Sequence, residues 1–371
     1  MPNIFDDGGS ELSQDAVLAY LIKWAKPEFA TENPEMHALG RRFVLALLNC
    51  ARQAEGHAAF PADFLIENLT LKKQHKVTLP NGRRGLIDLL VVINEVTYLI
   101  IEDKVGALEA PNQIHGYRTA LHRLDLQDIS AVYVKTGNET PPYVKTGNET
   151  RPRAHPLFGR FMRLDILAAL AGPLPDDCIV RQFREYLNHK ENNLASFQTA
   201  HPRDWSGDAI EGFLGWVTIL LHNLQVNDAE WSWQYNPRGG EWVCAWNWLP
   251  YQGPMHLLYL QTTHTLSGPP RLHVRIQFNH QFPADRQARS DAVADARKTL
   301  LAEHLQPQLP EMTRHRGRWN GRGQSGQVVE LRFAAHNAYG WLPLTPEGLV
   351  DLAATQQRLS AASAFLSAAI P

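Results

Sequence analysis

Residues 85–117 read GLIDLLVVINEVTYLIIEDKVGALEAPNQIHGY, and this stretch decides the fold of the first half of the chain. It contains two runs rich in Leu, Ile and Val that are too continuous for a sheet with one face in solvent. We therefore predict two strands that are covered on both faces. Three charged residues interrupt the runs, namely Asp88, Glu102 and Lys104. Because a charge buried without a partner is costly, they predict an ion pair, a bound metal or a functional edge.

The connection between the two strands decides whether these charges meet. Glu102 and Lys104 are two residues apart and share a face of the sheet, whereas Asp103 points to the other face. A two-residue turn would leave Asp88 on the face opposite to Glu102, but a three-residue loop over residues 94–96 sets the two carboxylates directly across from each other. Since Asn tolerates positive φ, the functional interpretation predicts this loop or a bulge. A buried ion pair between Lys104 and one carboxylate needs neither.

The order of these residues resembles the motifs of the PD-(D/E)XK nuclease superfamily. The residues that carry this resemblance are Asp88, Glu102, Asp103, Lys104, and then Gln113 and Tyr117, which match the Q-x-x-x-Y tail of RecB-type members. Upstream, residues 3–25 read NIFDDGGSELSQDAVLAYLIKWA, and Glu11 opens a predicted helix there. This segment resembles the first motif of an uncharacterised bacterial branch of the superfamily. The resemblance covers the first half of the chain and implies a restriction-endonuclease-like core, a mixed sheet flanked by helices.

The resemblance also implies a Mg²⁺-dependent endonuclease, with Mn²⁺ as the expected substitute. Phosphodiester hydrolysis needs an activated water and relief of the charge that builds in the transition state, and a hard divalent cation supplies both. Mg²⁺ prefers oxygen ligands. The implied metal ligands are Asp88, Glu102, the carbonyl of Asp103, and Glu11. Lys104 would orient the attacking water or steady the phosphate. The candidate catalytic residues are Glu11, Asp88, Glu102, Lys104, Gln113 and Tyr117.

Each helical candidate has an ordinary alternative. Glu11 in a first turn also simply favours the helix dipole, and only the order of the motifs argues for the site. Asp15 lies one turn further on the same face and is a weaker candidate. Gln113 and Tyr117 are four residues apart on the helix after Pro111, so they share a face that could hold a phosphate or the neighbouring strand. Taken alone, such a pair is typical of any helix surface.

Positive charge is local, because the net charge of the chain is −2. Residues 72–87 contain five basic residues and no acidic one: Lys72, Lys73, Lys76, Arg83 and Arg84. This hairpin leads into the strand of Asp88, where phosphates would pass, although a solvated strand pair explains it equally well. A second basic stretch, residues 313–326, includes Arg316, Arg318 and Trp319, which could grip phosphates and stack on a base. It could equally be a linker.

The composition of the 371 residues, 44% hydrophobic and 20% charged, is that of a globular protein long enough for two domains. The three cysteines are scattered, with no spacing for zinc or disulfides, which favours a cytoplasmic location. No signal peptide or membrane-spanning run is expected, and no P-loop motif occurs. A tandem repeat, YVKTGNETPP then YVKTGNETRP over residues 133–152, is interpreted as a tolerated surface loop.

The second half of the chain changes character. Five of ten tryptophans fall within residues 231–248, and alternating runs follow, so we predict an antiparallel meander. The tryptophans are interpreted as one packed sheet face, with a base-stacking surface as the alternative. We expect a helix over residues 285–304, a strand over 328–333 and a C-terminal helix from Pro346.

The sequence therefore predicts an α/β protein with a nuclease-like domain over residues 1–195 and an α+β recognition or assembly module over residues 196–371. The expected activity is cleavage of nucleic acid, with DNA favoured over RNA, in genome defence or mobile-element biology. That context comes only from the resemblance. The alternatives are a catalytically inactive protein that binds nucleic acid or a partner on a nuclease scaffold, and an effector regulated through the C-terminal module, which could also mediate a homodimer.

Overall fold

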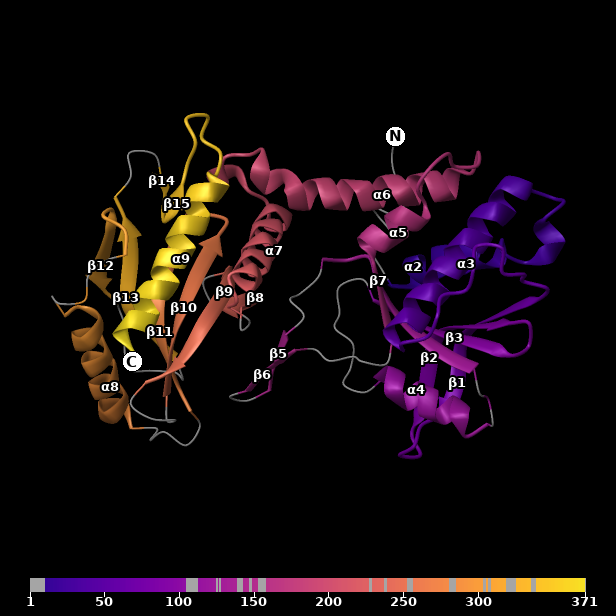
Figure 1. Ribbon diagram of the computed structural model, residues 1–371, viewed down its shortest axis with the longest axis horizontal. Helices are drawn as coiled ribbons and strands as arrows, with labels where there is room; N and C mark the ends of the chain where they lie inside the picture. The colour runs from indigo at the N-terminus through magenta and orange to yellow at the C-terminus, as the bar shows by residue number, and fades with distance from the viewer. Residues whose placement is uncertain are drawn as a thin grey trace. The chain divides into compact units, whose positions relative to one another are not determined.

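Contacts divide the chain into two compact units (Figure 1). Unit 1 comprises residues 1–139 and 154–191, and unit 2 comprises residues 140–153 and 192–371. The computed structural model describes residues 11–104, 113–124, 126, 128–138, 143–146, 149–152, 158–226, 229–236, 239–251, 256–279, 285–302, 305, 308–317, 325–334 and 338–370. Among the helices of these residues, none has the length and apolar composition needed to cross a bilayer.

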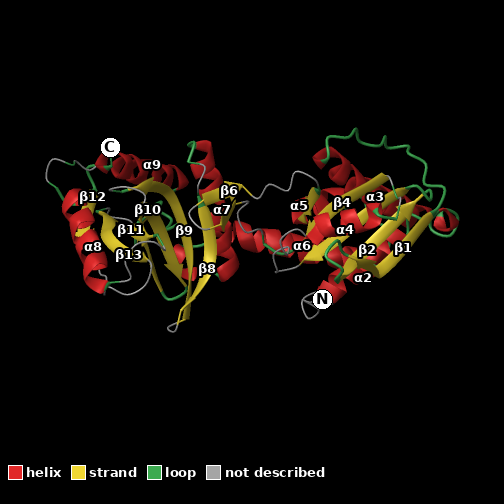
Figure 2. Cartoon of the chain, turned by 90° about the horizontal axis from the view of Figure 1, so that it is seen from below, coloured by secondary structure: helices red, strands yellow, loops and turns green. Residues whose placement is uncertain are grey.

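Unit 1 is built on a five-stranded mixed sheet in the order β1-β2-β3-β4-β7. The strands are β1 (Leu69–Thr78), β2 (Arg84–Ile93), β3 (Thr97–Lys104), β4 (Asp128–Lys135) and β7 (Gly159–Met162). The first three are antiparallel, whereas β4 is parallel to β3 and β7 is parallel to β4. The helices, drawn in Figure 2, are α2 (Glu11–Lys23), the 3-10 turn Pro27–Phe29, α3 (Pro34–Ala54), α4 (Gln113–His122), α5 (Arg163–Ala169) and α6 (Cys178–Ala195), whose last residues fall in unit 2.

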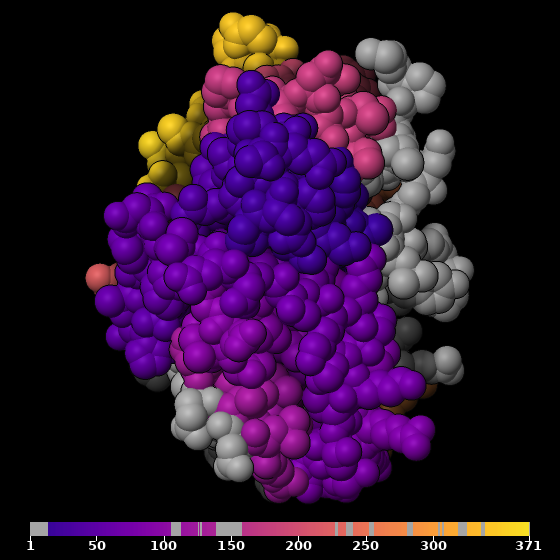
Figure 3. Space-filling model, turned by 90° about the vertical axis from the view of Figure 1, so that its right-hand side faces the viewer, coloured from indigo at the N-terminus to yellow at the C-terminus, as the bar shows by residue number. Residues whose placement is uncertain are grey.

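Both faces of β2 and β3 are buried, as their continuous apolar sequence predicted. One face packs against α2 and α3 through residues such as Leu89 and Ile101, and the other packs against α4 through Leu90 and Ile100. In the space-filling view, the indigo residues of the N-terminal helices lie above the purple residues of the β1–β3 region (Figure 3). This mixed sheet with helices on both faces confirms the predicted restriction-endonuclease-like core.

The loop between β2 and β3 has the predicted length. Ile93 pairs with Thr97, so three residues, 94–96, connect the strands. Asn94 has φ 52° and Glu95 has φ 62°, which is the left-handed region that Asn tolerates better than most residues. The side chain of Asn94 also bonds the backbone of the preceding segment, donating to the carbonyl of Leu65 at 2.9 Å. The register that brings Asp88 to the face of Glu102 is therefore set by this loop.

Unit 2 contains a six-stranded, wholly antiparallel sheet in the order β12-β13-β11-β10-β9-β8. Its strands are β8 (Glu230–Asn236), β9 (Gly239–Pro250), β10 (His256–Thr265), β11 (Gly268–Phe278), β12 (Met312–Arg316) and β13 (Ser325–Phe333), followed by the short β14 (Ala338–Tyr339) and β15 (Leu342–Pro343). Its helices are α7 (Gly207–Asn223), α8 (Arg286–Leu300) and α9 (Leu352–Ala369), with 3-10 turns at Ser196–Gln198 and Pro202–Asp204.

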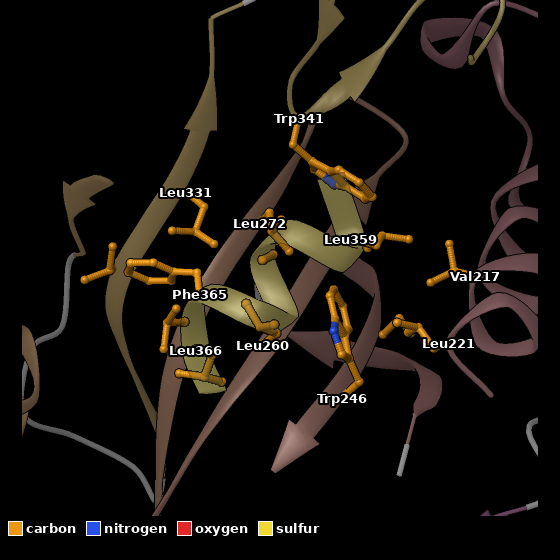
Figure 4. Packing of buried hydrophobic residues seen from close by; sticks show 14 of the residues in the cluster. Val217, Leu221, Trp246, Leu260, Leu272, Leu331, Trp341, Leu359, Phe365 and Leu366 are labelled. Atoms are coloured by element: carbon orange, nitrogen blue, oxygen red, sulfur yellow. The ribbon is translucent and has the colours of Figure 1, made fainter. Parts of the chain in front are cut away.

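The three helices cover one face of this sheet. Figure 4 shows Leu359, Phe365 and Leu366 of α9 close to Leu260, Leu272 and Leu331 of the strands, and Val217 and Leu221 of α7 near Trp246. Three of the five clustered tryptophans, Trp231, Trp242 and Trp246, belong to this core. The packed-face interpretation is confirmed for these three, whereas Trp233 is 46% exposed and Trp248 stacks on Tyr259.

One expectation for the C-terminal half was wrong in detail. The last helix begins at Leu352 instead of Pro346, because residues 345–349 form a turn in which Gly348 has φ 82°. Asp351 caps the helix by accepting a hydrogen bond from the N–H of Ala354.

The second copy of the tandem repeat, which we expected to be a tolerated surface loop, contains two short strands. Strand β5 (Tyr143–Thr146) pairs antiparallel with β6 (Glu149–Pro152).

Candidate active site

Three charged side chains meet where β2 and β3 lie side by side. The Nζ atom of Lys104 lies 2.9 Å from Glu102 Oε1 and 3.7 Å from Asp88 Oδ2. Asp88 also accepts hydrogen bonds from the backbone N–H of Asp103 at 3.1 Å and from Gln74 Nε2 at 3.3 Å. The structure thus brings together the two carboxylates and the lysine that the sequence singled out.

Glu102 is the most deeply buried member of this group, with no exposed surface. Burial raises its pKa to about 7; the nearby Asp88 carboxylate adds to the rise, and the ammonium of Lys104 opposes it. Its Oε1 atom has partners, but its Oε2 atom is buried without a hydrogen-bond partner among the described residues. A buried carboxylate oxygen without a partner is costly, so this atom is a natural ligand for a bound cation.

Helix α4 supplies two further side chains to Glu102. Gln113 donates from Nε2 to Glu102 Oε1 at 2.6 Å and to the hydroxyl of Tyr117 at 2.9 Å, and that hydroxyl donates to the carbonyl of Leu86 at 2.7 Å. The two α4 residues are therefore not an ordinary helix surface. Close approach of α4 to β2 depends on Gly85, because a Cβ atom there would lie 2.9 Å from Tyr117 Cε1.

The opposite face of β3 carries a second acidic pair. The side chain of Asp103 is 1% exposed and accepts a hydrogen bond from Gln14 of α2, which in turn accepts one from Thr136. Burial raises the pKa of Asp103 well above its ordinary value, and the neighbouring carboxyl of Asp15 adds to this rise. Burial likewise raises the pKa of Asp15, and Asp88 contributes. On this face, burial therefore works against the ionised form of both carboxyl groups.

The residues present fit a magnesium ion. Asp88 and Glu102 offer carboxylate oxygens, one of them without a partner, and the carbonyl of Asp103 lies beside them, where it accepts from Lys104 Nζ at 2.8 Å. Such a hard oxygen donor set is the one that Mg²⁺ prefers. Within the described ranges, no cluster of three or more His, Cys, Asp or Glu side chains arranged to hold a metal occurs. The side chain of Glu11, which begins α2, lies outside the described residues.

The candidate nucleic-acid contacts fall in both units. All five basic residues of the β1–β2 hairpin are exposed: Lys72, Lys73, Lys76, Arg83 and Arg84. Lys73 lies close enough to the site to lower the pKa of Asp15. Arg316 ends β12 in unit 2 and is exposed, while Arg318 and Trp319 lie outside the described residues.

Sequence reasoning missed two glutamines that bind the site carboxylates. Gln14 lies on the buried face of α2 and binds Asp103, and Gln74 of β1 binds Asp88. A polar residue among the apolar positions of an amphipathic helix was a usable signal for Gln14. Gln74 gave no such signal in its exposed strand, because its contact follows from the register of β1 and β2, in which its neighbours Lys73 and His75 pair with Leu89 and Ile87. Asp15, which the sequence made a weaker candidate than Glu11, lies close enough to Asp103 to contribute to the raised pKa of that carboxyl.

Comparison with known proteins agrees with this geometry. Residues 2–169 match the family model of the PD-(D/E)XK nuclease superfamily. No curated protein and no solved structure matches the chain. The matched region contains α2, the β2–β3 hairpin with its three charges, and α4. Over residues 2–169, somewhat less than half of its length, the chain is therefore similar to the PD-(D/E)XK nuclease superfamily.

Proposed function

We propose that unit 1 is a Mg²⁺-dependent nuclease that hydrolyses phosphodiester bonds of DNA. Members of the PD-(D/E)XK superfamily are typically metal-dependent nucleases that use divalent ions such as Mg²⁺. The observation that carries the proposal is the meeting of Asp88, Glu102 and Lys104, with both carboxylates within 4 Å of one ammonium. Two carboxylates and a lysine that converge on two neighbouring inner strands combine an oxygen site for a cation with a positive charge for a phosphate.

Each residue has a role that its contacts support. Asp88, Glu102 and the Asp103 carbonyl would hold the ion, which when bound activates water and offsets charge on the phosphate. Lys104 holds a compact positive charge beside both carboxylates and would turn it toward the phosphate and the attacking water. Gln113 fixes the orientation of the Glu102 carboxylate by donating to Oε1, and Oε2, which has no partner among the described residues, would bind the ion.

A binding protein that kept the nuclease scaffold is the second candidate. The observation in its favour is that Lys104 already pairs with both carboxylates, which satisfies the charges without an ion. In that case the acid cluster is structural, and the exposed basic residues of the β1–β2 hairpin carry the binding. The two candidates predict different effects of substitutions in the cluster of Asp88, Glu102 and Lys104 that keep the fold. The nuclease would lose cleavage of DNA, whereas the binding protein would keep its binding of nucleic acid.

Cleavage of plasmid and single-stranded DNA tests the proposal. The wild type is compared with Asp88→Ala and Lys104→Ala in Mg²⁺, Mn²⁺ or EDTA, and Lys298→Ala, an exposed lysine of α8, is the matched control. We expect metal-dependent cleavage that falls by about 100-fold or more in both site variants, as removal of a group that stabilises transition-state charge typically does. The control should cut like the wild type. Absence of cleavage by the wild type, with DNA binding intact, would favour the binding protein.

A further inference from the structure

A second polar surface lies in unit 2, around β13 and its neighbours β11 and β12. A cavity of about 740 Å³ runs along β13 there, between β11 and β12. Its lining extends from Gln327 to Phe333, six residue steps along the strand. At the usual rise of a β-strand this is a length of about 20 Å, much longer than a single phosphate group requires.

Charge on this surface is arranged in rows across the three strands. Glu330 of β13 pairs with His273 of β11 on one side and with His315 of β12 on the other. Leu272 pairs with Leu331. Arg271 precedes Leu272 and Arg332 follows Leu331, so the antiparallel register places the two arginines opposite each other. Like charges directly opposite each other on a sheet are destabilising, which favours a counter-charge above them.

The described lining contains one carboxylate against three arginines and a histidine: Glu330, and Arg271, Arg316, Arg332 and His315. Glu330 forms an ion pair with Arg332 at 3.1 Å. Among the described residues, neither Arg271 nor Arg316 makes an ion pair or a hydrogen bond, and both side chains are exposed. Two guanidinium groups with free donors therefore border the cavity.

Buried polar groups on the same face point to the same chemistry. His273 lies between Arg271 and Arg275 along β11 and is 5% exposed, yet its Nδ1 atom has no hydrogen-bond partner in the part of the chain that the structure describes. The Nε atom of Arg275 is also buried without a partner. Unused donors and acceptors that are buried cost free energy, and both of these lie on β11, the strand that borders the cavity.

We propose that this surface of β11, β12 and β13 binds the phosphate backbone of a nucleic acid. The inference deepens the proposed function, because it gives unit 2 the role of holding the substrate. Guanidinium groups bind phosphate oxygens in bidentate fashion, and a cavity about 20 Å long that is bordered by several arginines suits a sugar-phosphate chain better than an isolated anion.

Binding to fluorescein-labelled DNA, followed by anisotropy in EDTA with the full chain, tests this proposal. A single strand and a duplex of the same sequence are used as probes. The variant is Arg271→Gln with Arg316→Gln, two exposed positions whose change removes no buried contact. The matched control is Arg286→Gln with Lys298→Gln, which removes the same charge from the exposed side of α8.

Counterion release sets the expected effect. Each phosphate contact to a single strand contributes about −0.7 to the slope of log K against log salt, so loss of two contacts lowers the slope by about 1.4 and weakens binding about 25-fold at about 0.1 M salt. The probe that the wild type binds better identifies the form of the ligand. Equal binding by the variant and the wild type, equal loss in the variant and the control, or no binding by the wild type would overturn the proposal. Because EDTA prevents cleavage, this result is independent of whether unit 1 proves to be a nuclease.

Discussion

Replacing Glu102 with Gln should make the stability of metal-free unit 1 depend differently on pH. Burial raises the pKa of this carboxyl from the ordinary 4.5 to about 7 in the folded protein. The folded state therefore holds the proton more tightly than the unfolded chain does. Wild type has the full stabilisation from this group below pH 4.5 and loses it as the pH rises through 7, whereas the glutamine does not titrate.

The magnitude follows from the size of the pKa shift. A shift of one pKa unit corresponds to about 1.4 kcal/mol, so a rise from 4.5 to about 7 corresponds to about 3 kcal/mol. No discount for solvent screening applies, because the Glu102 side chain is fully buried. The free energy of unfolding of Glu102→Gln, minus that of wild type, should therefore increase by about 3 kcal/mol from pH 4.5 to above pH 7.

Urea unfolding in EDTA, read by pulsed hydrogen exchange on peptides from β2 and β3, measures this difference in unit 1 alone. The matched control is Gln113→Ala, which removes a hydrogen bond to the same carboxylate but keeps the titrating group, so its free energy of unfolding should still fall as the pH rises from 4.5 to above 7. A difference between Glu102→Gln and wild type that stays constant over this pH range would refute the reasoning. It would mean that Lys104 keeps Glu102 ionised at low pH.

Three further substitutions test the packing around the two units. Tyr117→Phe removes the hydroxyl that links Gln113 to the carbonyl of Leu86, and we expect cleavage to fall and unit 1 to lose about 1 kcal/mol in urea unfolding. Gly85→Ala should destabilise unit 1 by about 1–3 kcal/mol in the same assay, because the new Cβ atom would crowd Tyr117. Trp246→Ala should cost unit 2 about 3–5 kcal/mol, measured by hydrogen exchange in β9 and β10, because the fully buried indole leaves a cavity.

Each of these substitutions has a comparison that isolates its cause. Gly82→Ala is the control for Gly85→Ala, since a Cβ atom at Gly82 meets nothing within 4 Å. The φ of 79° at Gly82 still adds some backbone strain to this control. Trp233→Ala is the control for Trp246→Ala, because the Trp233 side chain is 46% exposed. Equal losses within either pair would contradict the packing account. Tyr117→Phe with unchanged cleavage would show that the hydroxyl does not help to orient Glu102.

The β2–β3 hairpin and its charges were predictable because strand geometry has few solutions. A period of two residues fixes the faces, and the positive φ that Asn94 tolerates makes the three-residue loop possible. Glu102 and Lys104 could therefore be placed on one face from the sequence, whereas the face of Asp88 depended on the loop length, which the structure gives as three residues. The contacts of Gln113 and Tyr117 followed only from the order of the motifs, since helix spacing alone does not say which sheet face α4 covers.

The remainder depended on tertiary contacts that no local pattern encodes. The contact of Gln74 with Asp88 depends on the register of β1 against β2, and the pair of Asp15 with Asp103 requires α2 to pack against the far face of β3. The start of α9 was misjudged because Pro346 is a common first helical residue, whereas Asp351 provides the actual cap. The paired strands of unit 2 follow from alternation, but the rows of charge across them follow from register.

Crystals of the protein grown with Mn²⁺ would test the central claim most directly, through the anomalous scattering of the bound ion. The account predicts an ion within coordination distance of Asp88, Glu102 Oε2 and the Asp103 carbonyl, at about 2.0–2.2 Å from each oxygen as for a hard divalent cation. It also predicts that this peak is lost in Asp88→Ala. An ion bound elsewhere, or no ion while Lys104 still pairs with both carboxylates, would contradict the claim that this cluster is a metal centre.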